Sequence, residues 1–152
     1  MSRAEKAKEY FNQGYACSQA VALAFADVAG LDLNTLSKLT LPFGGGIGRQ
    51  RLVCGAVSGM VAICGLLCAG EENTPENKKR TYEITRLLCD RFKAENGSLI
   101  CEELLTGAHL QVEIGGTAEP RTTEYYKKRP CGEIVYTAAK ILEEYLQENG
   151  KI

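Results

Sequence analysis

The chain has 152 residues, of which 45% are hydrophobic and 24% charged, a balance typical of globular domains rather than of disordered or fibrous chains. This length allows one sizeable core and requires no second domain, so we expect a single domain over residues 1–152. A formal net charge of -1 argues against nucleic acid as a partner, because phosphate binding normally needs a surplus of Lys and Arg.

The opening segment, residues 1–9, alternates charges and lacks the apolar run of a secretory signal. This pattern predicts a protein of the reducing cytoplasm, where permanent disulfides are not expected. The seven cysteines are therefore best interpreted as metal ligands, redox thiols or small core residues.

Helical spacing of apolar residues predicts three helices in the first third of the chain, over residues 2–13, 16–29 and 32–39. Gly14 and Gly30 are suited to end the first two helices, and Asp32 can cap the third. After Pro42 the chain enters residues 43–48, Phe-Gly-Gly-Gly-Ile-Gly, called the glycine loop below. It is the most unusual backbone segment of the sequence.

Residues 53–69 contain no charge and no polar face, which is the pattern of a helix surrounded by other helices. The alternative is a membrane span. The run is at the lower length limit for crossing a bilayer, is rich in small residues, and has no aromatic belt or second candidate span. We therefore predict a buried central helix without a membrane span, and note that its apolar surface could also form a homodimer.

The second half of the chain predicts three more helices, over residues 74–96, 98–106 and 130–147. Pro75 and Pro130 lie where a helix favours proline, in its first turn. Residues 107–128 carry no clear pattern, so the sequence predicts no structure for them. Together the elements predict an all-α fold, a bundle of about five to seven helices around the apolar segment 53–69.

Four of the cysteines occupy equivalent positions, in the first turn of a predicted helix: Cys17, Cys54, Cys101 and Cys131. Free N–H groups and the helix dipole at such a position favour a thiolate, which is the reactive and metal-binding form of cysteine. Helix starts from one small bundle can meet at one end of it. We therefore expect the four side chains to converge on one site, against the alternative that they are small core residues.

The other three cysteines, Cys64, Cys68 and Cys89, fall in helix interiors, where burial as small hydrophobic residues is the simpler interpretation. Cys68 would lie about 21 Å along a straight helix from Cys54, too far to share one small site. His109 is the only histidine and lies in the unpatterned region, so a mixed Cys/His site has little basis.

Backbone and cations beside Cys54 are further candidates for the site. Successive free N–H groups of the glycine loop can form a concavity for anions or sulfur, although the loop has no nucleotide-binding signature and a plain turn is the alternative. The candidate cofactor-binding residues are Gly44, Gly45, Gly46, Gly48, Arg49, Arg51 and Gly55. Lys127, Lys128 and Arg129 could add positive potential near Cys131, unless they are simply solvated.

Residues 14–20, Gly-Tyr-Ala-Cys-Ser-Gln-Ala, then Cys54-Gly55-Ala56-x-x-Gly59, then Cys101 and Cys131 resemble the C-GCAxxG-C-C family of redox-active proteins. The resemblance covers most of the chain, although the central motif here reads Cys-Gly-Ala. It implies that the four matching cysteines are the functional ones. A more distant resemblance to part of split-Soret cytochromes implies an iron–sulfur or electron-transfer setting. The chain lacks the Cys-x-x-Cys-His motif of covalent haem attachment, so haem is not implied.

Three hypotheses follow for the four cysteines. The leading one is an iron–sulfur cluster that exchanges electrons with an unidentified donor or acceptor, since four thiolates are the required ligand number. The second is thiol–disulfide chemistry, with Cys54 as the attacking thiol and Cys17, Cys101 or Cys131 resolving. The third is a structural or metal-sensing zinc site, which the long intervals between the cysteines disfavour.

Overall fold

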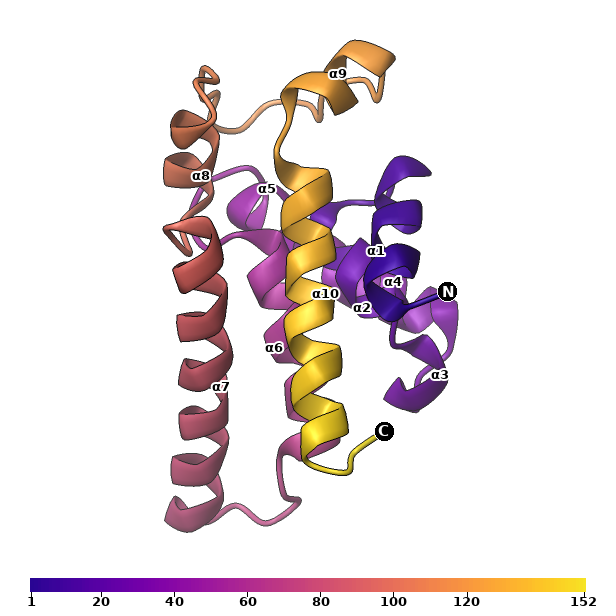
Figure 1. Ribbon diagram of the computed structural model, residues 1–152, viewed down its shortest axis with the longest axis vertical. Helices are drawn as coiled ribbons and strands as arrows, with labels where there is room; N and C mark the ends of the chain where they lie inside the picture. The colour runs from indigo at the N-terminus through magenta and orange to yellow at the C-terminus, as the bar shows by residue number, and fades with distance from the viewer.

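The all-α fold is confirmed by the computed structural model, which describes residues 1–152 and contains no strand. Its helices, in chain order, are α1 (Arg3–Asn12), α2 (Cys17–Leu23), α3 (Ala26–Ala29), α4 (Leu33–Thr40), the 3-10 turn η1 (Leu41–Phe43), α5 (Gly44–Ile47), α6 (Gly55–Cys68), α7 (Pro75–Asn96), α8 (Cys101–Gly107), α9 (Thr123–Lys128) and α10 (Cys131–Glu148). Figure 1 shows α6, α7 and α10 running side by side, with α1 to α4 packed on one flank.

Local capping fixes the ends of the outer helices. Ser2 and Glu5 form a capping box at the start of α1. Thr74 caps α7 by accepting from the Asn77 amide, and the left-handed Gly97 ends that helix. These bonds satisfy backbone groups that would otherwise lack partners, so the sequence-based bounds of α7 hold.

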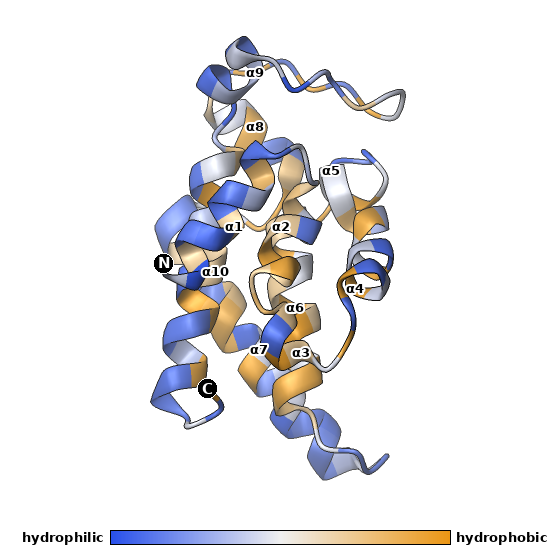
Figure 2. Ribbon diagram, turned by 90° about the vertical axis from the view of Figure 1, so that its right-hand side faces the viewer, coloured by the Kyte–Doolittle hydropathy of each residue, from blue (hydrophilic) through white to orange (hydrophobic).

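The uncharged helix α6 forms the centre of the core. Val57, Met60 and Ile63 on this helix are at most 3% exposed, and Leu66 is the one large hydrophobic residue of α6 that remains exposed. Figure 2 shows hydrophobic residues concentrated on α6 and hydrophilic ones on the outward sides of α1 and α10. Most of the apolar surface of α6 is therefore buried within its own chain. No helix is both long and apolar enough to cross a membrane.

The predicted single helix over residues 16–29 is wrong, because the chain breaks between α2 and α3 at Phe25. Arg3 supplies the physical reason. Its guanidinium donates to the Ala24 carbonyl at 3.0 Å and lies 5.1 Å from the centre of the Phe25 ring. The carbonyl is thus satisfied by a distant side chain, and Phe25 turns fully into the core.

The glycine loop is not a simple turn. It begins at the last residue of η1 and contains the short α5, with left-handed backbone at Gly45 and Gly46. The amide of Gly48 and three amides that follow the loop bond back to carbonyls of residues 42–46, which coils the segment tightly on itself. Glycine permits this conformation without the strain that a Cβ would add.

Residues 107–128, for which the sequence predicts no structure, contain an irregular stretch, residues 111–122, called the strap below, followed by α9. The strap bonds to the residue that follows the glycine loop, from the Gly115 amide to the Arg49 carbonyl, at 2.8 Å. Figure 2 shows this stretch extending across the end of the bundle above α5. It closes the end at which several helices begin.

Candidate functional site

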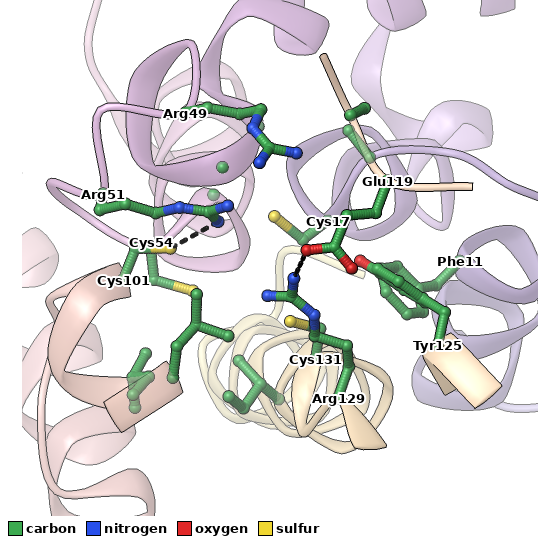
Figure 3. Close-up of a pocket in the computed structure, with 18 of the residues that line it drawn as sticks. Phe11, Cys17, Arg49, Arg51, Cys54, Cys101, Glu119, Tyr125, Arg129 and Cys131 are labelled. Carbon is green, nitrogen blue, oxygen red and sulfur yellow. Dashed lines mark hydrogen bonds and ion pairs between the residues drawn. The ribbon is translucent and has the colours of Figure 1, made fainter. Parts of the chain in front are cut away.

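Cys17, Cys54, Cys101 and Cys131 all line one cavity of about 240 Å³, at the end of the bundle where α2, α6, α8 and α10 begin. Figure 3 shows their sulfur atoms around this cavity. Cys54 is 6% exposed, and the other three are half-buried. Four residues distant in the sequence are thus brought together by four helix starts.

Three of these cysteines lie where the sequence predicts, as the first residue of α2, α8 and α10. Cys54 differs, because it is the N-cap that precedes α6 rather than part of its first turn. An antiparallel bridge between Val53 and Ile100, and a 2.8 Å bond from the Cys54 amide to the Leu99 carbonyl, hold its backbone in a non-helical conformation. The same bridge ties Cys54 to the start of α8 and therefore to Cys101.

Two glycines allow the cysteine-bearing segments to approach one another. A Cβ at Gly55 would lie 2.5 Å from the Cys17 sulfur, and one at Gly46 would lie 2.8 Å from the Cys101 Cβ. Both distances are shorter than real side-chain contacts allow. Gly55 and Gly46 are thus required for the cavity wall to close.

Burial disfavours ionisation of three of the cavity thiols, those of Cys17, Cys54 and Cys131. Burial raises the pKa of Cys54 well above its usual value, and the nearby Cys17 adds to this, while the Ala56 and Val57 amides oppose it. Burial and Cys17 likewise raise the pKa of Cys131 to about 12. Burial also raises the pKa of Cys17, against an opposing amide from Gly45. These thiols are therefore neutral near pH 7 unless a cation binds them.

Cys101 has a cationic neighbour. Arg51 donates through Nη1 to the Cys101 sulfur at 3.7 Å, and through Nε to the Glu113 carbonyl at 2.9 Å. Arg51 is 6% exposed, and its backbone carbonyl also accepts from the Glu102 amide in the first turn of α8. Side chain and backbone of Arg51 thus both hold the start of α8, and the guanidinium places a positive charge beside the Cys101 sulfur.

Four arginines and one glutamate line the cavity: Arg49, Arg51, Arg121, Arg129 and Glu119. Arg129 pairs with Glu119 (Figure 3). Arg121 donates to the Phe11 and Tyr15 carbonyls at 3.0 Å each and lies 4.4 Å from the Phe11 ring centre. These contacts hold the strap over the cavity. The cavity wall carries more positive than negative side chains.

Of the other predicted site residues, Gly44, Gly45, Gly55, Arg49 and Arg51 line the cavity, whereas Gly46 and Gly48 do not. Gly46 instead packs behind the wall, and Gly48 supplies a left-handed turn. Lys127 and Lys128 are solvent-exposed, while Arg129 beside them turns inward. Cys64, Cys68, Cys89 and His109 lie outside the cavity.

The sequence does not indicate Phe11, Glu119, Arg121 or Tyr125 as cavity residues. Glu119 and Arg121 belong to the strap, which has no periodicity to place it. Phe11 lies within the helix predicted over residues 2–13, and helical spacing alone does not relate it to the cysteines. Arg121 contacts residues more than 100 positions earlier, a pairing that only the tertiary fold reveals.

The four sulfurs face one cavity without surrounding one point. No group of three or more His, Cys, Asp or Glu side chains in the molecule is arranged to hold a metal ion. The thiols nevertheless influence one another electrostatically, since Cys17 raises the pKa of both Cys54 and Cys131. Cys17, Cys54 and Cys131 are therefore neighbours across the cavity.

Residues 15–145 match the model of the family described as "Putative redox-active protein (C_GCAxxG_C_C)". The chain belongs to this family. The matched range includes all four cavity cysteines of this C_GCAxxG_C_C protein, together with the glycine loop and the strap. No curated protein and no solved structure matches the chain.

Proposed function

We propose that this C_GCAxxG_C_C protein holds an iron–sulfur cluster in the cavity, on Cys17, Cys54, Cys101 and Cys131, and carries electrons between a donor and an acceptor. The supporting observation is that four cysteines from four separate helix starts line one cavity. Four thiolates are the usual ligand set of such clusters. The reducing cytoplasm, our proposed location, would keep these thiols available.

A cluster and a single zinc ion require different arrangements of thiols. A single zinc ion needs four sulfurs about 2.3 Å from one point. No group of three or more His, Cys, Asp or Glu side chains is arranged to hold a metal ion. A cluster distributes its ligands over several iron atoms, so its cysteines need not surround one point.

The charges of the wall also fit an iron–sulfur cluster. Four thiolates around an iron–sulfide core leave a net negative charge, and the lining carries four arginines against one glutamate. A buried surplus of positive charge is costly without a counter-charge. Arg51 in particular already donates toward the Cys101 sulfur.

In this proposal the chain's own residues hold and tune the cluster, which when bound would supply reversible one-electron transfer. The amides of Ala56 and Val57 face the Cys54 sulfur, and the Gly45 amide faces that of Cys17. Hydrogen bonds to ligand sulfurs stabilise the more negative, reduced state and raise the reduction potential. The strap and the buried Cys54 limit access of water to the same space.

Thiol–disulfide exchange is the alternative that one contact favours. Attack requires a thiolate, and the burial that raises the pKa of Cys54 opposes its role as the attacking thiol. Cys101 is the cavity cysteine whose sulfur accepts a hydrogen bond from a guanidinium, that of Arg51, and it is therefore the candidate nucleophile in that case. A redox-cycling protein without iron, inactivated most strongly by Cys101→Ser, would support this alternative.

Replacing each cavity cysteine by serine tests the cluster proposal. After anaerobic reconstitution, Cys17→Ser, Cys54→Ser, Cys101→Ser and Cys131→Ser should each bind less iron and sulfide than the wild type, or release it faster. Cys89→Ser is the matched control, because Cys89 is half-buried in α7 outside the cavity. Equal iron content in the control and all four cavity variants would refute the proposed ligand set.

A further inference from the structure

Arg49 has an unsatisfied buried group. Its Nη2 is the single buried side-chain nitrogen or oxygen in the molecule without a hydrogen-bond partner. The side chain is 13% exposed and lines the cavity. Its backbone also has a positive φ of 62°, an unfavourable conformation for a residue with a side chain. Such strain is found mainly at functional sites.

The strap holds this guanidinium in place. Nε of Arg49 donates to the Gly115 carbonyl at 2.9 Å, and the Gly115 amide donates to the Arg49 carbonyl at 2.8 Å. The nearest carboxylate oxygen, on Glu113, lies 4.0 Å from Nη2, beyond hydrogen-bond distance, on a side chain that is 72% exposed. Arg49 is thus held by the strap at Nε, and Figure 3 shows its guanidinium directed toward the cavity.

A buried guanidinium N–H without an acceptor is costly, so an acceptor that approaches the Arg49 guanidinium from the cavity would stabilise it. A carboxylate matches the planar fork of a guanidinium with two parallel hydrogen bonds. Most other lining residues are hydrophobic, among them Leu41, Leu104 and Ile134. They would accommodate a short apolar tail behind the carboxylate.

We propose that Arg49 binds the carboxylate of a small monocarboxylic acid with a short hydrocarbon chain, inside the cavity that the four cysteines line. This adds a ligand site to the proposed electron carrier and does not depend on the cluster. Three other partners could satisfy Nη2: a cluster sulfide, ordered water, or Glu113 after a side-chain rotation. Each of these makes a different experimental prediction.

Butyrate is a suitable probe, with butyramide as its uncharged counterpart of the same shape. Titrated at constant ionic strength into isotope-labelled protein, butyrate should shift the Arg49 Nε–Hε resonance saturably, with a Kd on the order of millimolar for so small a ligand. Butyramide should leave it unchanged. A response that does not saturate, or an equal response to both probes, would overturn the proposal.

Substitutions assign the binding to Arg49. Arg49→Gln and Arg49→Lys should each weaken butyrate binding at least tenfold, because both lose the planar fork of the guanidinium. The rise in melting temperature that butyrate causes measures binding in each variant. The lysine variant retains the charge in case the glutamine variant folds poorly. Arg86→Gln, an exposed position on α7, is the matched control and should bind as the wild type does. Unchanged affinity in both Arg49 variants would overturn the site.

The same titration in metal-free and reconstituted protein separates this site from the cluster. Binding to either form supports the site, even if the protein never takes up iron. If butyrate binds neither form while Arg49→Gln lowers the iron content, Arg49 serves the cluster and the carboxylate site is refuted. Glu113→Gln should preserve or strengthen binding, since a competing carboxylate is removed. Loss of binding in Glu113→Gln would contradict the proposed role of Arg49.

Discussion

Gly59 shows how a single hydrogen in place of a side chain positions the site. A Cβ at Gly59 would lie 2.5 Å from the Ser18 carbonyl oxygen, so this glycine lets α6 lie directly against α2. Gly55, one turn earlier, makes the equivalent approach to Cys17. Because the two glycines are four residues apart, they lie on the same face of α6, and both approach α2 there.

Alanine substitutions within α6 test this packing. Gly59→Ala should lower the free energy of unfolding by about 1–3 kcal/mol, because the new methyl group overpacks against backbone. Gly65→Ala, the matched control in the same helix, meets no atom within 4 Å and should raise it by about 0.5–1 kcal/mol. Urea unfolding measures both. A Gly59→Ala variant as stable as Gly65→Ala would contradict the close contact with α2.

Among the elements, the strap is held to the bundle chiefly by arginine side chains. Arg49 and Arg51 donate to carbonyls near its beginning, and Arg121 anchors its end to α1, through the Phe11 carbonyl and ring, and to the Tyr15 carbonyl after that helix. The same guanidinium groups line the cavity. Closure of the strap and the charge inside the cavity are therefore physically linked.

Removing the Arg121 anchor should loosen the whole strap. Arg121→Ala loses two hydrogen bonds and a cation–π contact, together worth about 2 kcal/mol, so exchange of the Gly115 amide should rise about ten- to a hundredfold. Lys127→Ala, on the exposed side of α9, is the control and should leave this amide unchanged. Hydrogen exchange measures both variants. Unaltered exchange in Arg121→Ala would show that the two ends of the strap are held independently.

The elements that the sequence predicts well are those with local causes. Thr74 and Pro75 start α7, Gly97 ends it, and the apolar period after Cys131 defines α10. The break at Phe25 could not be predicted, because it depends on Arg3 approaching from α1. Long-range side-chain contacts of this kind leave no periodic pattern in the sequence.

In the candidate site too, some positions follow from local patterns and others depend on long-range contacts. The helix-start positions of Cys17, Cys101 and Cys131 follow from local patterns, and they suggest a common end of the bundle. The non-helical backbone of Cys54 depends instead on the bridge between Val53 and Ile100, which pairs two short segments far apart in the chain. Isolated bridges between such segments have too little pattern to be predicted.

At the scale of the whole molecule, charge is distributed unevenly. The chain has a formal net charge of -1, yet the cavity is lined by four arginines and a single glutamate. Overall composition therefore conceals a local concentration of positive charge around four cysteines. An anionic occupant of the cavity explains this concentration, and iron bound by cysteine thiolates together with sulfide is the occupant that we propose.

The iron and acid-labile sulfide content of the wild-type protein, purified without exposure to oxygen, decides whether the cavity holds a cluster. We predict about two to four iron atoms per chain, an equal amount of sulfide, and a visible absorption band that disappears on reduction or in air. Colourless protein that contains neither iron nor sulfide, even after anaerobic reconstitution, would contradict the proposed electron carrier.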